Sequence, residues 1–161
     1  MKSYATAAIL ALGATLLPQG RLYAQEPLSI ARTAVVQRAE SQVFETLKSD
    51  LSTGRAGLLE LKSANQASGT LAAARDHVDS ITWRKWAYCK LGPLDMFDSL
   101  QDGRVSLRVN LAAQGKTSTR VRAGADFTGV YRGFSAAKTV RCVSLGVLEQ
   151  EVLRLAGAAQ R

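Results

Sequence analysis

The chain has 161 residues, of which 47% are hydrophobic and 21% charged, and its 21 Lys and Arg outnumber its 13 Asp and Glu for a formal net charge of +8. A chain of this length forms one domain around a single apolar core. Beyond the opening residues no apolar run is long enough for a transmembrane helix, and we find no internal repeat or low-complexity tract. The sequence therefore predicts one domain without membrane-spanning helices.

The opening segment, 1–24, has the layout of a secretory signal peptide. Lys2 supplies the positive start, residues 5–17 are uncharged and mostly apolar, Pro18 breaks the helix, and Ala24 is a small residue before a cleavage site. The apolar run is shorter than the roughly 20 residues that span a bilayer. We therefore expect cleavage before Gln25 and a periplasmic or secreted mature chain.

Positive charge is concentrated in the second half of the mature chain. Segment 25–81 has 6 basic and 7 acidic residues, a charge of −1, whereas 82–161 has 13 and 6, a charge of +7. A field of this sign attracts anionic partners, for which an anionic polymer of the cell envelope is one candidate. The alternative is a solvated basic surface that keeps an exported protein soluble.

Two cysteines remain after export, Cys89 and Cys142, and an exported protein with an even number of cysteines most simply pairs them. The chain-entropy model assigns such a crosslink about 4 kcal/mol. The two thiols are far apart in sequence and His77 is the single histidine, so we expect a structural disulfide and no metal.

The N-terminal part of the domain, 25–80, is predicted to be helical. Apolar residues recur at helical spacing over 33–51, and a polar stop follows at Ser52 to Gly54. A second helix is expected over 71–78, where alanine is abundant. His77 would lie near its C-terminal end as a surface or capping residue.

The part from 81 to 161 is predicted to be a disulfide-tied β-meander followed by a helix. Strand-forming residues occupy 81–91, and strict alternation of apolar and polar residues over 105–111 and 119–127 indicates two further strands. Val140 and Cys142 would share one side of a short strand. Leu145, Leu148, Val152 and Leu155 then form one face of a terminal helix, for which Ser144 is the expected N-cap. The predicted fold is α+β, with an antiparallel meander of 3–4 strands covered by the C-terminal helix.

The segment 110–118, NLAAQGKTS, ends like a phosphate-binding loop. Such a loop needs a glycine at the position of Asn110 and must lead into a helix, whereas 119–127 repeats with period two. We interpret Gly115 and Lys116 as a hairpin turn. Neither a nucleotide nor another cofactor is expected.

The segment 142–149, CVSLGVLE, resembles the closing signature CVSTGxLE of small bacterial envelope lipoproteins of unknown function. The likeness covers eight residues, Leu145 replaces the threonine, and no lipidation cysteine follows the signal segment. The resemblance implies an envelope location and a strand that leads into a helix, and it implies no activity.

Cationic and aromatic residues are the candidate binding residues. Arg108, Arg120 and Arg122 fall on the polar face of the meander, whereas the first predicted strand places Arg84, Trp86, Tyr88 and Lys90 on one face. Together they could bind phosphates and stack on rings or sugars. The alternative makes the aromatic residues part of the core and the arginines solvated strand positions.

An enzymatic function is not expected. The chain has no GxSxG or HExxH motif, and its two carboxylate pairs, Asp95 with Asp98 and Glu149 with Glu151, fit a turn and a helix start as solvated structural groups. The sequence thus predicts a non-enzymatic exported protein that binds an anionic or protein component of the cell envelope. The alternative is a carrier of small amphiphilic ligands in a cavity between helix and sheet.

Overall fold

The computed structural model describes residues 32–90, 99–132 and 136–158. The predicted signal peptide, 1–24, and the carboxylates Asp95 and Asp98 lie outside the described residues. In the described part of the chain, no helix is long and apolar enough to cross a membrane.

The described elements form an α+β domain with one antiparallel sheet of seven strands and three helices. In chain order they are β1 (Arg32–Val36), α1 (Glu40–Ser52), β2 (Glu60–Asn65), β3 (Thr70–Arg75), α2 (Ser80–Trp86), β4 (Ala87–Tyr88), β5 (Ser99–Ala113), β6 (Thr119–Arg132), β7 (Ala137–Ser144) and α3 (Val147–Leu155). The spatial order is β2-β3-β5-β6-β7-β4, and β1 pairs with β6 beside β7. The sheet is therefore larger than the predicted meander of 3–4 strands.

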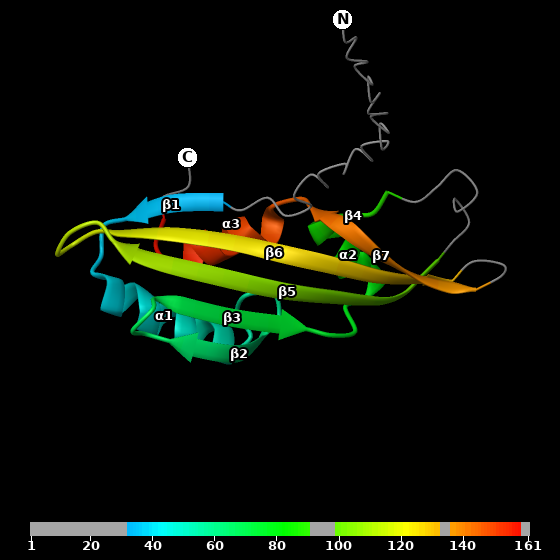
Figure 1. The fold of residues 1–161 in the computed structure, drawn as a ribbon, viewed down its shortest axis with the longest axis horizontal. Helices are drawn as coiled ribbons and strands as arrows, with labels where there is room; N and C mark the ends of the chain where they lie inside the picture. Colours follow the sequence, from blue (N-terminus) through cyan, green and yellow to red (C-terminus); the bar gives the residue numbers. More distant parts are fainter. Residues whose placement is uncertain (1–31, 91–98, 133–135, 159–161) are drawn as a thin grey trace, which may run out of the picture.

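The long hairpin of β5 and β6 is the centre of the sheet (Figure 1). Its register runs from Ser99 opposite Arg132 to Ala113 opposite Thr119, and Gln114 N donates to Ser118 O at 2.8 Å in the loop. This confirms the two strands and the hairpin turn that the alternation predicted. Alternation also decides which side is buried, because successive side chains of a strand point to opposite faces.

The core lies between one face of the sheet and the helices (Figure 1). The sheet supplies Val105, Leu107, Val109, Leu111, Val121, Ala123, Ala125 and Phe127, while α1 and α3 supply Val43, Phe44, Leu47, Leu51, Leu148, Val152 and Leu153. From α2, Trp83 packs edge-on against Phe127 with ring centroids 5.6 Å apart. Burial of these apolar side chains is the main force that holds the helices on the sheet.

Of the two helices predicted in the N-terminal part, the first is confirmed except for its start and the second is wrong. The helix predicted over 33–51 begins at Glu40, and Thr33 to Val36 belong to β1, whose short β-branched run pairs with the edge of β6. The helix predicted over 71–78 is β3, although alanine has the highest intrinsic helix propensity. Tertiary context overrides that preference, because this segment pairs with β2 on one side and β5 on the other.

The strand predicted over 81–91 is wrong in its first part, which forms helix α2. Asp79 caps this helix, since its side chain accepts hydrogen bonds from Ile81 N at 3.1 Å and Thr82 N at 2.9 Å. Trp83 and Trp86 are three positions apart and face the core from one side of α2. The chain then becomes extended as β4.

His77 is exposed, as predicted, but it lies in the loop between β3 and α2 and not in a helix. Its backbone has a positive φ of 57°, and its Nδ1 lies 3.1 Å from Asp102 Oδ1 of β5. The residue therefore joins two chain segments at the surface.

The C-terminal strand and helix are present, but two details of their junction differ from the prediction. The N-cap residue of α3 is Gly146, with φ 78°, and not Ser144. Ser144 instead accepts a hydrogen bond from Gly146 N at 2.9 Å and donates one to Glu149. Glu149, expected in solvent, is 0% exposed.

Candidate functional site

The sheet has a second face that the helices do not cover, which we call the open face. In β5 and β6 its central residues are Ser106, Arg108, Asn110, Ala112, Arg120, Arg122, Gly124 and Asp126. They alternate with the core residues of the same strands, so the hydrophobic pattern that builds the core also fixes which side chains meet water.

The open face brings together three predicted site residues, Arg108, Arg120 and Arg122. Arg108 lies opposite Gly124 and Arg122 opposite Asn110, which makes the two arginines diagonal neighbours, about 7–8 Å apart at the backbone. Arg120 is the next residue of β6 on this face. The intervening side chains are short, so three guanidinium groups lie together on one exposed surface.

These arginines are poorly neutralised. Among the described residues, no carboxylate forms an ion pair with Arg108, Arg120 or Arg122, and Arg120 Nη2 donates to the amide oxygen of Gln114 at 3.0 Å. Asp126 is the acidic residue of the central open face, and it lies 3.7 Å from Arg141 of β7. Each guanidinium therefore keeps donors free for an anion.

Sequence reasoning missed three further arginines on the open face. The register places Arg104 opposite Thr128, Arg141 opposite Thr128 on its other side, and Arg132 opposite Ser99. Their signal was the same alternation that located Arg108: Arg104 and Arg132 lie just beyond the two strands predicted from it, and Arg141 lies between Val140 and Cys142 in the predicted short strand. Arg104 contacts Asp102 at 3.3 Å, so this end of the face is closer to neutral than the centre.

The other four predicted site residues do not join this cluster. Trp86 is in α2 and faces the covered side of the sheet, where it is 8% exposed, whereas Arg84 is exposed on the same helix. Tyr88 is an exposed residue of β4 opposite Val143, and Lys90 follows the strand. The predicted face of the first strand does not exist, because a helix occupies most of that segment.

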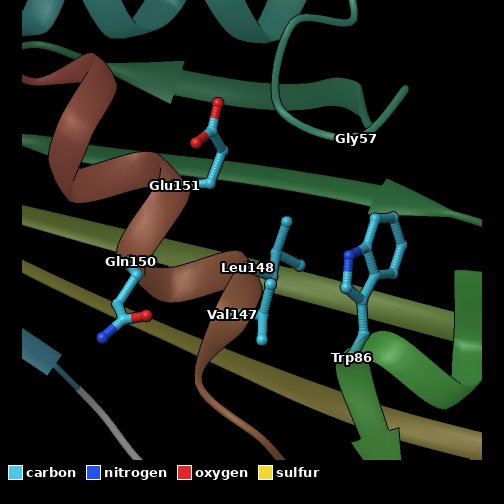
Figure 2. Close-up of a pocket in the computed structure, with 6 residues that line it drawn as sticks. All are labelled: Gly57, Trp86, Val147, Leu148, Gln150 and Glu151. Atoms are coloured by element: carbon cyan, nitrogen blue, oxygen red, sulfur yellow. The ribbon is translucent and has the colours of Figure 1, made fainter.

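A pocket of about 360 Å³ lies on the helix side, between α2, α3 and the loop before β2 (Figure 2). It is lined by Gly57, Trp86, Val147, Leu148, Gln150 and Glu151. The benzo ring of Trp86 rests on Gly57, where a Cβ atom would lie 2.5 Å from Trp86 Cζ2. Glycine is also favoured there by its φ of 65°. The loop and the indole thus fix one wall of the pocket together.

The charged group at the pocket, Glu151, is already paired. Arg154 Nε donates to Glu151 Oε2 at 2.8 Å, and this hydrogen bond is the main reason that the pKa of Glu151 lies below its usual value. Figure 2 shows the side chains of Gln150 and Glu151 directed away from the indole. The inner surface of the pocket is therefore formed by Trp86, Val147, Leu148 and Gly57.

Two further kinds of group are relevant to a functional site, the cysteines and the side chains that could bind a metal ion. Cys89 and Cys142 form the predicted disulfide. Among the described residues, no group of three or more His, Cys, Asp or Glu side chains could hold a metal ion.

No protein-family model matches the chain, and no curated protein matches it in sequence. Among solved structures, a TBP-like protein from Parabacteroides distasonis is similar with a TM-score of 0.40 and 11% identity, over 71% of this chain and 66% of that chain. A DUF4468 family protein from Bacteroides ovatus is similar with a TM-score of 0.35 and 14% identity, over 69% of this chain and 59% of that chain. The matched part thus spans less than two thirds of either neighbour.

Proposed function

We propose that this chain is an exported, non-enzymatic protein that binds an anionic component of the cell envelope through the open face. The observation that carries the proposal is the cluster of Arg108, Arg120 and Arg122, three adjacent cationic side chains without a carboxylate partner among the described residues. Arginine is suited to phosphate and carboxylate groups because its planar fork donates two parallel hydrogen bonds.

The shape of the open face supports an extended ligand. Alanine, glycine, serine and threonine occupy positions between the arginines, including Ala72 and Ala74 of β3 and Gly124 of β6. Such short side chains leave the guanidinium groups as the highest points of the surface. A polyanion or an anionic lipid surface can therefore reach several of them at once.

Export is part of the proposal and has two supports. One is the signal-like layout of segment 1–24. The other is the Cys89–Cys142 disulfide, because such bonds persist mainly in oxidising compartments such as the periplasm.

Binding to labelled polyphosphate and to phosphatidylglycerol vesicles tests the proposal and distinguishes the two ligand sources. Each arginine near an anionic surface contributes about 1 kcal/mol, so the double variant Arg108→Gln/Arg122→Gln should bind roughly 30-fold more weakly. Raising the ionic strength from about 0.05 to about 0.5 M should weaken wild-type binding by at least about tenfold, because screening shortens the reach of exposed charges.

The matched control is Lys48→Gln/Lys85→Gln, which removes the same charge from exposed positions on α1 and α2. We expect this variant to retain most of the binding. Equal losses in the two double variants would show that only net charge matters, and wild-type binding to neither probe at low salt would refute the proposal.

A further inference from the structure

The indole N–H of Trp86 is a hydrogen-bond donor that the described residues leave open. Trp86 is 8% exposed, and none of the described residues accepts a hydrogen bond from its Nε1. The other tryptophan, Trp83, donates its Nε1 hydrogen to Cys89 Sγ at 3.4 Å. Among the described residues, the buried side-chain nitrogen without a hydrogen-bond partner is Arg32 Nε, so Trp86 Nε1 is not sealed from solvent and can donate to water or to a ligand.

The unpartnered donor faces the pocket between α2 and α3. Figure 2 shows the nitrogen edge of the indole directed toward Leu148, while the opposite edge of the ring rests on Gly57. The volume of about 360 Å³ falls within the range of small-molecule sites. An acceptor atom that enters the pocket can thus bond to Trp86 while its apolar neighbours contact Val147 and Leu148.

The surroundings select against a charged ligand. Glu151 is engaged by Arg154, so the lining offers no free carboxylate for a cation. The same carboxylate at the rim disfavours an anion, and no cationic side chain lines the described walls of the pocket. The Trp86 donor lies beside Val147 and Leu148, with the polar side chains of Gln150 and Glu151 at the rim, and this lining fits an uncharged group best.

We propose that this pocket binds an uncharged amphiphile, with an aromatic or branched apolar body and one carbonyl-type oxygen that accepts the Trp86 N–H. The site is independent of the open face, which lies on the other side of the sheet and uses charge. Binding here is accordingly insensitive to ionic strength.

Fluorescence titration with prodan, a neutral naphthalene dye that carries one carbonyl group, tests the site in the intact protein. Wild type should bind the dye saturably and shift its emission to the blue. Trp86→Phe keeps an aromatic ring and removes the donor, so the dye should bind about 5- to 10-fold more weakly. Dimethylaminonaphthalene, which lacks the carbonyl, should bind wild type and Trp86→Phe about equally.

A rim variant keeps the test decisive if Trp86→Phe unfolds. Val147 is 45% exposed at the first position of α3, where a glutamate is compatible with the helix, so Val147→Glu places a charge at the pocket without loss of core packing. Its matched control is Ile81→Glu, at a position 71% exposed on α2 and absent from the lining.

We expect Val147→Glu to weaken dye binding at least about tenfold and Ile81→Glu to leave it unchanged. Equal affinities in these two variants, or no saturable binding by wild type, would overturn the proposal. Equal affinity of wild type for prodan and for the dye without a carbonyl would overturn the role of Trp86 as donor.

Discussion

The side chain of Glu149 completes the hydrogen bonding of β6 by accepting the backbone N–H of Ala125 at 3.2 Å. On this edge of β6, β1 pairs with residues 119–123 and β7 with residues 127–132, so no described strand pairs with the stretch between them. The second oxygen of Glu149 accepts from Ser144 Oγ at 2.9 Å. A side chain from α3 therefore satisfies a backbone group that a continuous edge strand would satisfy elsewhere.

Replacing Glu149 should destabilise the fold strongly. Glu149→Ala leaves the Ala125 N–H and the Ser144 hydroxyl buried without their acceptor, so the free energy of unfolding should fall by about 3 kcal/mol. Glu149→Gln keeps an oxygen for Ala125 and should lose about 1 kcal/mol. Urea denaturation measures both. Glu151→Ala, at a partly exposed position of the same helix, is the control; a loss as large as that of Glu149→Ala would contradict this account.

Elements that depend on local pattern could be predicted from the sequence. The β5–β6 hairpin follows from strict alternation, and α3 from apolar residues at helical spacing. The prediction for the segment that forms β3 was wrong because its alanines favour a helix in isolation. Only pairing with β2 and β5 makes the segment a strand. Helix α2 could have been predicted from the sequence, because Asp79 is a suitable N-cap residue and the two tryptophans of the helix are three positions apart.

The two candidate sites differ in the same way. That Arg108, Arg120 and Arg122 share one face of the sheet could be predicted from the sequence, because the alternation that places apolar side chains on one face of a strand places the others on the opposite face. The pocket at Trp86 was not, because its walls come from the loop at Gly57 and the start of α3, which are brought together only by the folded chain. The prediction of a strand at Trp86 also gave no reason to expect its indole N–H to face a pocket.

Removing the disulfide should cost much of the stability of the domain. The Cys89–Cys142 bond joins residues with a sequence separation of 53, for which the chain-entropy model gives about 4 kcal/mol. Cys89→Ala/Cys142→Ala should therefore unfold at a much lower urea concentration than the oxidised wild type. Reduced wild type should behave like the variant. If dithiothreitol leaves the transition unchanged while a thiol assay shows full reduction, the bond is not a major source of stability.

Asp79 should make the stability of α2 depend on pH in the acid range. Hydrogen bonds from the backbone and hydroxyl of Thr82 hold the pKa of Asp79 below its usual value of about 4. A lowered folded-state pKa means that the contribution is present above the unfolded pKa and is lost as pH falls through the folded one. Asp79→Asn keeps a capping oxygen but should lose this part of the pH dependence, whereas Asp79→Ala should lose both the cap and the slope. Thermal melts of the three proteins between about pH 2 and pH 6 measure this pH dependence. Parallel curves of melting temperature against pH for the three proteins would contradict the prediction.

Tyr131 should make the fold less stable in alkali. Its side chain is buried beside Gly129, and this burial raises the pKa of Tyr131 above its usual value of about 10. Because the folded chain holds the phenol proton more tightly than the unfolded chain, the contribution is present below the unfolded pKa and is lost as pH rises from there through the folded pKa. Tyr131→Phe cannot ionise, so its unfolding free energy should fall less steeply than that of wild type above about pH 10. Urea titrations from about pH 8 to pH 11 compare the two proteins, and the difference between their slopes removes the effect of the lysines that titrate in the same range. If the two free energies fall in parallel throughout, burial of the phenol has no energetic consequence for its ionisation.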